Sequence, residues 1–499
     1  MGPTMSADDD RKICHNCVGE AYLSNLIETD GEVALCHYCG DDEEKCIPIE
    51  ELADHIEGAF ERHYYRTSDQ PDMYESMLLR DKEIDYDWDR HGEPVLEAIA
   101  EAASIEEDAA KDVLDILEDR HADFESAQMG EECEFDSDSR YEWKSARDHE
   151  FAFEWRNIER SLKSQSRFFN QGAEAFLARL FANLDGRTTR DGHPVVVAAG
   201  PDTAHASFFR ARVFHKSDDL DEAMKRPDLH LGPPPERFAR AGRMNANGIS
   251  MFYGASDKGV ALAEVRPPVG SRALVAEFKI MRPLRLLDVT ALQSVYVDGS
   301  VFDPDYLEQL SLAKFMGRLS DRITMPVMPD DEPTEYLITQ MIADYLARQP
   351  APALDGILFP SVQSPGDHRN VVLFHHASRV QHLEIPKGTE ISARQYDSTE
   401  DGDETDYRVW EEVPPAPEKK EEPDDEFGFL AFTKPPRFDP NEDARDVTLA
   451  VMTNAISAHH ITGVTFATDD FEVSRSRMEK REWKFARPAQ KPMPDDLDF

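Results

Sequence analysis

The sequence predicts an α+β protein in which a cysteine-rich segment and a helical region precede a domain of mixed strands and helices. Three patterns support this prediction. Paired cysteines near the amino terminus have the spacing of a metal site, apolar residues after Pro48 recur at helical intervals, and short β-rich runs begin near Pro194. The chain of 499 residues is long enough for several domains, at about 150 residues per domain. We therefore expect separate cores along one chain.

Composition and charge exclude several classes of protein. Apolar residues make up 40% of the chain, which is typical of a globular protein, and no run of about 18 uncharged apolar residues is present to span a bilayer. Asp8, Asp9 and Asp10 stand where a secretory signal would be basic and then apolar, so we expect a cytoplasmic protein with no membrane contact. The net charge of −45 repels the phosphate backbone and disfavours bulk binding of nucleic acid.

Residues 1–47 are predicted to form a zinc ribbon. Cys14 and Cys17 make one Cys-x2-Cys pair, and Cys36 and Cys39 make a second, which is the spacing of a four-thiolate zinc site. Free thiols or two disulfides are the alternative interpretation of the same spacing. Four cysteine ligands leave no open position for a substrate, so the predicted zinc is structural rather than catalytic.

Residues 48–190 are predicted to form an α-helical domain with solvated acidic outer faces. Apolar residues recur at three- and four-residue intervals from Ile49 to Phe60. The pair Ser104 and Glu107 has the spacing of a capping box, which predicts the start of a helix through Leu117. Two more helices are expected in this domain, at 151–162 and 173–184.

Residues 191–390 are predicted to form the mixed α+β domain. Helical patterns occur at 303–319 and 332–347. Short β-rich or apolar runs predict strands at 195–197, 208–214, 272–280, 356–360 and 371–375.

The carboxy-terminal part is predicted to lie apart from this domain. Residues 391–440 are acidic and proline-rich, which is typical of a disordered linker. Residues 441–499 are expected to form a small element of unknown role, with a helix at 447–461 and a strand at 463–467. Because the linker separates this element from the mixed domain, we expect a deletion after Pro414 to leave activity nearly intact.

Arginines are concentrated near the start of the mixed domain of this otherwise acidic chain. They are Arg210, Arg212, Arg237, Arg240 and Arg243. Guanidinium groups bind phosphate oxygens in a bidentate manner and stay charged, so a ligand with a pyrophosphate group is a natural candidate. The alternative is that these arginines only neutralise neighbouring carboxylates.

The segment from Arg240 to Val265 resembles the core motif of the RES-domain family. In that motif an arginine in a Gly-Arg-x-Asn loop precedes a strand that ends in tyrosine, and a helix with a glutamate follows. Arg243, Tyr253 and Glu264 match these positions in order.

Two flanking segments extend the resemblance. Arg212 matches the arginine of the family's first strand, and Ser361 matches the serine of its closing segment. The preceding region resembles the zinc-ribbon and HEPN-like helical part that accompanies some RES domains. The resemblance therefore implies an ADP-ribosyltransferase-like RES domain preceded by a zinc ribbon and an α-helical bundle.

The resemblance also implies that NAD is the substrate and that Glu264, Arg243, Tyr253 and Ser361 are the catalytic residues. Glu264 would bind the ribose hydroxyls in an oxocarbenium-like transition state, and Ser361 would orient either that carboxylate or the ligand. Outside such a motif, a helical glutamate is usually a solvated surface residue, and a tyrosine at a strand end usually packs in the core.

NAD itself is expected to contact Arg212, Arg243, Tyr253 and Asn245. The two arginines would bind the pyrophosphate, and the tyrosine ring would stack on the nicotinamide or the ribose. Asn245 belongs to the same motif loop.

Three functions are compatible with these features. The first is an NAD-consuming toxin or defence effector that uses water or phosphate as acceptor and is controlled by an antitoxin or other regulatory protein. The second is a mono-ADP-ribosyltransferase that modifies a protein or another macromolecule. The third is a zinc-ribbon binding adaptor with an inactive RES-like domain, which an intact set of Arg243, Tyr253 and Glu264 disfavours.

Overall fold

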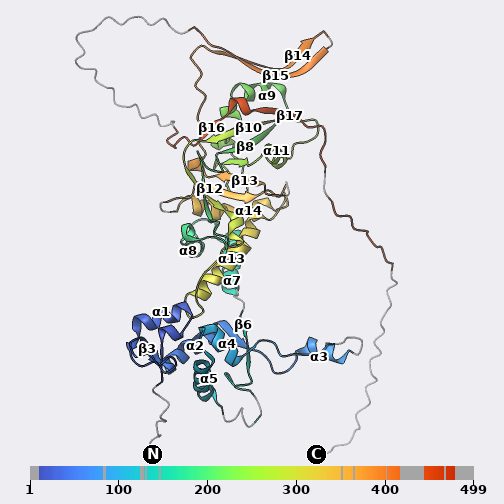
Figure 1. Ribbon diagram of the computed structural model, residues 1–499. Helices are drawn as coiled ribbons and strands as arrows, with labels where there is room; N and C mark the ends of the chain where they lie inside the picture. The colour runs from blue at the N-terminus through green and yellow to red at the C-terminus, as the bar shows by residue number, and fades with distance from the viewer. Residues whose placement is uncertain are drawn as a thin grey trace, which may run out of the picture.

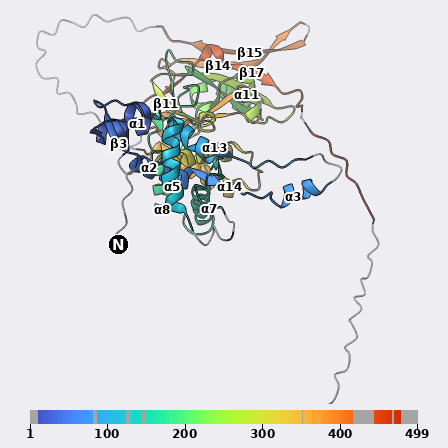
Figure 2. The same cartoon turned by 60° about the horizontal axis from the view of Figure 1, so that its bottom comes forward.

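The computed structural model describes residues 11–81, 86–123, 129, 132–144, 148–349, 352–363, 366–400, 402–415, 443–465 and 468–477. Figure 1 shows an amino-terminal module, residues 11–144, at one end of the molecule and a large mixed sheet at the other. Helices lie between them in Figure 1, and in Figure 2, where the bottom of the first view comes forward, the module overlaps these helices. None of the helices in the described ranges combines the length and the apolar composition needed to cross a membrane.

The amino-terminal module combines a small cysteine-bearing sheet with a helical core. Its first sheet has the order β1-β3-β2, from β1 (Lys12–Cys14), β2 (Glu32–Val33) and β3 (Lys45–Pro48), next to α1 (Ala21–Asp30). The helices are α2 (Ile49–His63), α3 (Met73–Arg80), α4 (Val95–Ala103) and α5 (Glu107–His121). A second sheet contains β4 (Tyr64–Arg66), β5 (Glu93–Pro94) and β6 (Arg140–Trp143). One core joins the first sheet to the helices and also takes in Phe302 of the mixed domain.

The predicted helix through Leu117 is confirmed, but its predicted capping box is wrong. Ser104 has a φ of 50° and closes α4 in the left-handed conformation. The helix α5 begins after Glu106, which makes no capping hydrogen bond through its side chain. The Ser-x-x-Glu spacing therefore coincides with the tight turn between two helices.

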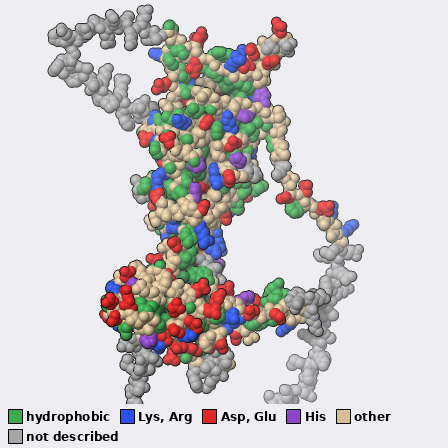
Figure 3. Space-filling view, viewed as in Figure 1, with side chains coloured by type: hydrophobic (Ala, Val, Ile, Leu, Met, Phe, Trp, Pro, Cys, Tyr) green, Lys and Arg blue, Asp and Glu red, His purple; other side chains and the backbone are tan. Residues whose placement is uncertain are grey.

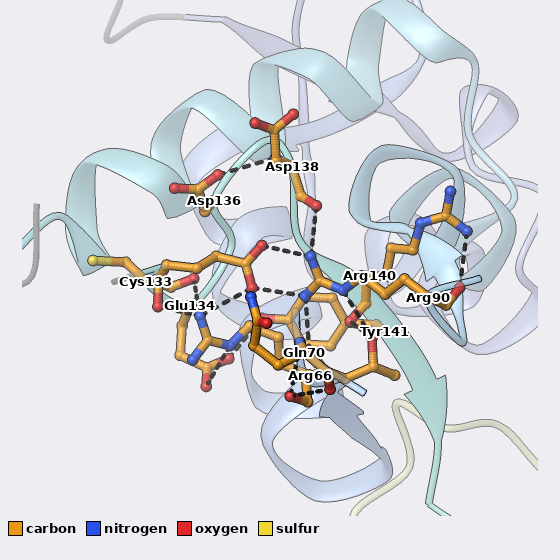
Figure 4. A network of polar contacts seen from close by, with 12 residues as sticks. Arg66, Gln70, Arg90, Cys133, Glu134, Asp136, Asp138, Arg140 and Tyr141 are labelled. Atoms are coloured by element: carbon orange, nitrogen blue, oxygen red, sulfur yellow. Dashed lines mark hydrogen bonds and ion pairs between the residues drawn. The ribbon is translucent and has the colours of Figure 1, made fainter. Parts of the chain in front are cut away.

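The loop before β6 is held by arginines from other parts of the module. Arg90 donates to the carbonyl oxygen of Asp138 at 3.0 Å, and Arg66 donates to that of Cys133 at 2.8 Å (Figure 4). Phe135 is buried in the module core. The described part of this loop therefore contributes to the module core.

Acidic side chains crowd the visible face of the amino-terminal module in Figure 3. This distribution agrees with the solvated acidic outer faces that the helical periodicity predicts. Much of the negative charge therefore lies away from the mixed sheet.

The mixed sheet has nine strands in the order β16-β10-β8-β9-β13-β12-β11-β7, with β17 also paired to β10. Of its pairings only β11 with β12 is parallel. The strands are β7 (Val196–Ala199), β8 (Ser207–Phe214), β9 (Phe252–Ala255), β10 (Arg272–Ile280), β11 (Leu284–Asp288), β12 (Gly356–Pro360), β13 (Arg369–Leu373), β16 (Leu449–Val451) and β17 (Ser457–His460). The predicted strands at 195–197, 208–214, 272–280, 356–360 and 371–375 are confirmed with small shifts at their ends.

Helices cover one face of this sheet. They are α7 (His149–Ser164), α8 (Gln171–Leu180), α12 (Val289–Leu292), α13 (Tyr306–Thr324) and α14 (Glu332–Ala347), whose apolar faces share one core with the sheet. On the other face lie α9 (Ser217–Lys225), α10 (Pro227–His230) and the hairpin of β14 (Glu390–Thr399) with β15 (Gly402–Glu412). The predicted helices at 303–319 and 332–347 are confirmed as α13 and α14.

The helices α7 and α8 pack with the mixed domain, although they precede the domain boundary that was expected at residue 190. Trp155 and Phe176 lie in the core of the mixed domain, where both rings contact Phe315 of α13. Helical periodicity shows that a helix has an apolar face, but it does not show which partner covers that face. The core of the mixed domain thus begins near Phe151 rather than near residue 191.

The expected helix at 447–461 is wrong. This segment forms β16 and β17 around the short 3-10 helix η5 (Thr453–Ala455), and residues 461–465 carry no strand. Short apolar runs fit a helix and a buried strand equally well, and pairing with β10 decides between them here. The predicted linker also begins later, because β14 and β15 occupy 390–412, while 416–442 lies outside the described residues.

A chain that ends at residue 415 is therefore expected to be less stable than the full chain. The sequence had instead predicted that a deletion after Pro414 leaves activity nearly intact. Leu449 and Val451 are buried in the core that faces α9, and β16 and β17 cover the edge of β10. Burial of two such side chains stabilises a fold by about 3–6 kcal/mol. In denaturant unfolding, the midpoint of this shorter chain should lie at a lower denaturant concentration than that of the full chain. A chain that ends at residue 477 is the control, and equal midpoints for all three chains would contradict the prediction.

Candidate functional site

The four predicted cysteines form one cluster. Cys14 directly precedes the 3-10 turn η1 (His15–Cys17) and Cys17 ends it, and Cys36 and Cys39 come from the turn after β2. The sulfur of Cys14 lies 3.6 Å from those of Cys17 and Cys39, and all four sulfurs lie within 4.8 Å of one another. Zinc–sulfur bonds of about 2.3 Å in a tetrahedron put the sulfurs about 3.8 Å apart. The donor set and its spacing thus fit one tetrahedral metal ion.

Glu264 ends the helix α11 (Lys258–Glu264), which begins at the Asp257 cap. Its Oε1 accepts two hydrogen bonds of 2.7 Å, one from the Ser361 hydroxyl and one from Nδ2 of Asn370. Ser361 is 8% exposed and Asn370 is 5% exposed, whereas Glu264 itself is exposed. The carboxylate is therefore fixed by buried donors while part of it faces outward.

A cavity of about 220 Å³ lies beside this carboxylate. Its lining includes Arg210, Tyr253, Glu264, Phe359 and Asn370. The cavity opens where the sheet is incomplete, because β8 and β9 pair only through one residue of each strand. Complete ligand pockets hold roughly 300–1,000 Å³, so this cavity suits one end of a ligand rather than a whole dinucleotide.

Tyr253 lines the cavity and is tied to the motif loop. Its hydroxyl donates to Oδ1 of Asn245 at 2.7 Å and accepts from the backbone N–H of Met244 at 3.1 Å. Burial raises the pKa of Tyr253 to about 12, so the phenol stays protonated. A Cβ on Gly242 would lie 2.9 Å from this hydroxyl, which explains the glycine.

Asn245 supports the loop rather than facing the cavity. Its Nδ2 donates to the carbonyl oxygens of Arg240 and Ile249, both at 2.9 Å, and the side chain is buried. The structure thus brings Asn245 to Tyr253 but not to the open space beside Glu264.

Arg210 also lines this cavity, although the sequence named it only as one of five clustered arginines and not as an NAD contact. Its Nη1 donates to the carbonyl oxygen of Tyr253 at 2.8 Å, and its guanidinium lies 5.5 Å from the Phe252 ring centre. Burial and the nearby charge of Arg212 lower the pKa of Arg210 to about 10, so it is still protonated at neutral pH. Arg210 and Arg212 are two residues apart on β8 and so lie on the same face of the sheet, and the sequence alone could not decide which of them lines the cavity.

Arg212 lies at a second cavity, of about 900 Å³, together with Arg237 and Arg240. Its Nη1 donates to the carbonyl oxygen of His230 at 2.5 Å, and the side chain is exposed. Among the described residues, none of these three arginines forms an ion pair with a carboxylate. The lining also includes Glu236, so three arginines and one glutamate give the cavity a net positive charge.

Arg243 does not reach the Glu264 cavity in this structure. Its Nη1 donates to the carbonyl oxygens of Ile323 at 2.6 Å and Met325 at 2.9 Å, at the carboxyl end of α13. The guanidinium also lies 5.6 Å from the centre of the Tyr336 ring. Free carbonyls at a helix end attract cations, so Arg243 anchors the motif loop to α13.

Comparison with protein families matches residues 209–398 to the RES domain. This segment is a RES domain. The match runs from β8 into β14 and includes Arg243, Tyr253, Glu264 and Ser361. No curated protein and no solved structure matches the chain. RES domains are generally associated with NAD-related toxin activity.

Structure outside the matched segment completes the mixed sheet and its helical cover. The strands β7, β16 and β17 extend its sheet on both sides, and α7 and α8 cover one face. The predicted resemblance to the RES family is confirmed. The HEPN-like origin of the helical region and the ADP-ribosyltransferase-like fold stay predictions.

Proposed function

We propose that the RES domain binds NAD and breaks the bond between nicotinamide and ribose. The observation that carries this proposal is the Glu264 carboxylate, which Ser361 and Asn370 fix at the mouth of a small cavity lined by Tyr253. A solvated surface glutamate would have no such pair of buried donors. The same observation argues against an adaptor with an inactive RES-like domain.

In the proposed reaction the bond between ribose C1′ and the nicotinamide nitrogen breaks. Its electron pair leaves with the nitrogen, which loses its positive charge, and the ribose becomes an oxocarbenium-like cation. An acceptor oxygen then bonds to C1′ and releases a proton. Glu264 accepts hydrogen bonds from the ribose hydroxyls, and its negative charge stabilises the cation. Tyr253 forms the wall against which a flat ring or the ribose packs.

The diphosphate of NAD is proposed to lie at the cavity with Arg212, Arg237 and Arg240. Arg210 and Arg212 are two residues apart on β8, a spacing of about 7 Å, so the two cavities adjoin along one strand. Guanidinium groups without carboxylate partners are suited to phosphate oxygens. Arg243 is proposed to support binding through the loop that it anchors to α13.

Arg212→Ala is expected to raise the dissociation constant for NAD by about 10-fold or more, because a hydrogen bond between charged groups contributes about 1.5–3 kcal/mol. Its melting temperature should change little, since the side chain is exposed. Calorimetric titration with NAD measures the constant, and Arg156→Ala on the exposed surface of α7 is the control. An unchanged constant for Arg212→Ala would remove this arginine from the proposed site.

Product analysis tests the proposed reaction directly. The purified full chain is incubated with NAD, alone, with inorganic phosphate, and with candidate acceptor proteins, and the products are separated by chromatography. Free nicotinamide together with ADP-ribose identifies hydrolysis. Free nicotinamide together with the phosphate ester of ADP-ribose identifies phosphorolysis, and free nicotinamide together with a protein that carries ADP-ribose identifies mono-ADP-ribosylation. Intact NAD under all three conditions, with folded protein, would exclude the proposal.

We further propose one structural zinc ion at Cys14, Cys17, Cys36 and Cys39. The proposal is supported by the sulfur distances and by the four-sulfur donor set, which leaves no position for a substrate. In a toxin or defence effector, the module that carries this zinc would be the part that an antitoxin or other regulatory protein contacts.

A further inference from the structure

We propose that Asn370 is a positioning residue, which together with Ser361 fixes Oε1 of Glu264 and so directs Oε2 toward the ligand. The inference rests on the proposed NAD cleavage and deepens it. Asn370 was not among the catalytic residues implied by the family motif.

The backbone of Asn370 is held on both sides. It lies in β13, between β9 and β12, where it faces Ala255 on one neighbour and Phe359 on the other. The side chain is 5% exposed and therefore has little freedom to change rotamer. Its Nδ2 reaches Oε1 of Glu264 at 2.7 Å.

Glu264 needs such support because of its place in the fold. It is the last residue of a short helix and is exposed, so its three side-chain torsions would otherwise be free. Ser361 follows the end of β12, Asn370 lies in the neighbouring β13, and both donate to the same oxygen. Among the described residues Oε2 has no hydrogen-bond partner, so ligand hydroxyls can bond to it in one fixed geometry.

The burial of Asn370 favours this role over one in stability. Its Oδ1 is buried and has no hydrogen-bond partner in the described chain. An unsatisfied buried acceptor destabilises a fold by roughly 1–3 kcal/mol, and a small apolar residue would avoid that loss at a central strand position. The contact with Glu264 gives a reason for an amide at this position.

Asn370→Asp is the sharpest test, because it keeps the shape of the side chain but replaces the donor with a second carboxylate. Two carboxylates in contact share a proton, so the pair should stay protonated to a higher pH. We expect kcat for NAD cleavage at pH 7 to fall about 100-fold and KM to change less than about threefold. The acid limb of the pH–rate profile should move up by about one pH unit or more.

The variant is compared with Asn157→Asp on the exposed surface of α7, which should keep the parental rate and profile. In a Glu264→Gln background, Asn370→Asp should cause almost no further loss, because both residues act through one carboxylate. A role in folding alone would lower the rate additively and leave the pH profile unchanged. Thermal melting is recorded for every variant. If Asn370→Asp does not fold, Asn370→Ser is measured in its place, with an expected loss of about 10-fold in kcat.

A second readout does not depend on NAD turnover. Protonated carboxyl groups react with a water-soluble carbodiimide and an amine, and mass spectrometry follows the labelling of Glu264 against pH. We expect its half-labelling pH to rise by about one unit or more in Asn370→Asp.

The two proposals fail in distinguishable ways. A parent without NAD turnover would refute the proposed function, and the labelling curve would still decide the role of Asn370. An active parent, with an Asn370→Asp variant of similar rate, pH profile and labelling, would overturn the inference.

Discussion

Glu264→Gln is expected to abolish NAD cleavage while folding and NAD binding stay close to those of the parent. The glutamine keeps the length of the side chain and an oxygen that can accept from Ser361 and Asn370. It removes the negative charge, which matters most when the ribose becomes cationic in the transition state. The loss of one positioned charge lowers rates by a factor on the order of 100 to 1000.

The measurement is kcat for release of nicotinamide, together with the dissociation constant for NAD and the melting temperature. Glu174→Gln, on the exposed surface of α8, is the matched control and should behave as the parent does. Turnover by folded Glu264→Gln within about threefold of the parent would show that the carboxylate is not catalytic.

Much of the mixed domain could be predicted because local chemistry determines it. The strands β8, β10, β12 and β13 are runs of apolar and β-branched residues bounded by turns, and tertiary contacts do not override that pattern. The cysteine cluster was predictable for a similar reason, since a metal site with paired cysteines depends on spacing along the chain.

The catalytic contacts could be predicted only in part. The family resemblance predicted that Ser361 orients either Glu264 or the ligand, and the structure shows a hydrogen bond between Ser361 and Glu264. The sequence assigned no role to Asn370, because an asparagine within a strand carries no local signal, and only the register of β13 against β9 and β12 brings it to Glu264. Arg243 lies away from the Glu264 cavity because it donates to two carbonyl oxygens at the carboxyl end of α13.

The carboxy-terminal strands were missed because they depend on a distant partner. Residues 449–451 and 457–460 form strands only by pairing with β10, which lies far earlier in the chain. Periodicity within so short a segment fits more than one structure. The same limit applies to α7 and α8, whose apolar faces were visible but whose partners were not.

Removal of the predicted zinc is expected to unfold the amino-terminal module. The strands of the small sheet beside the cysteine cluster are only two to four residues long, and the buried residues around the cluster are few. Ile13, Val18 and Ile47 nevertheless belong to the core shared with α2, α4 and α5, so loss of the ribbon should spread into the helices. Structural zinc contributes about 10–16 kcal/mol of apparent binding free energy near pH 7 in small domains of this type.

Cys36→Ser combined with Cys39→Ser should therefore reduce zinc from one ion per chain to none and lower the helix signal in circular dichroism. Cys133→Ser, at a cysteine outside the cluster, is the control and should keep the metal. Elemental analysis that finds no zinc in the freshly purified parent would refute the metal site. Zinc loss with an unchanged thermal transition would mean that the core of Leu52, Ile56 and Val113 holds the module without the ribbon. Phe302 of the mixed domain inserts into that same core, so we also expect hydrogen exchange to rise around residues 301–306 when the zinc is lost.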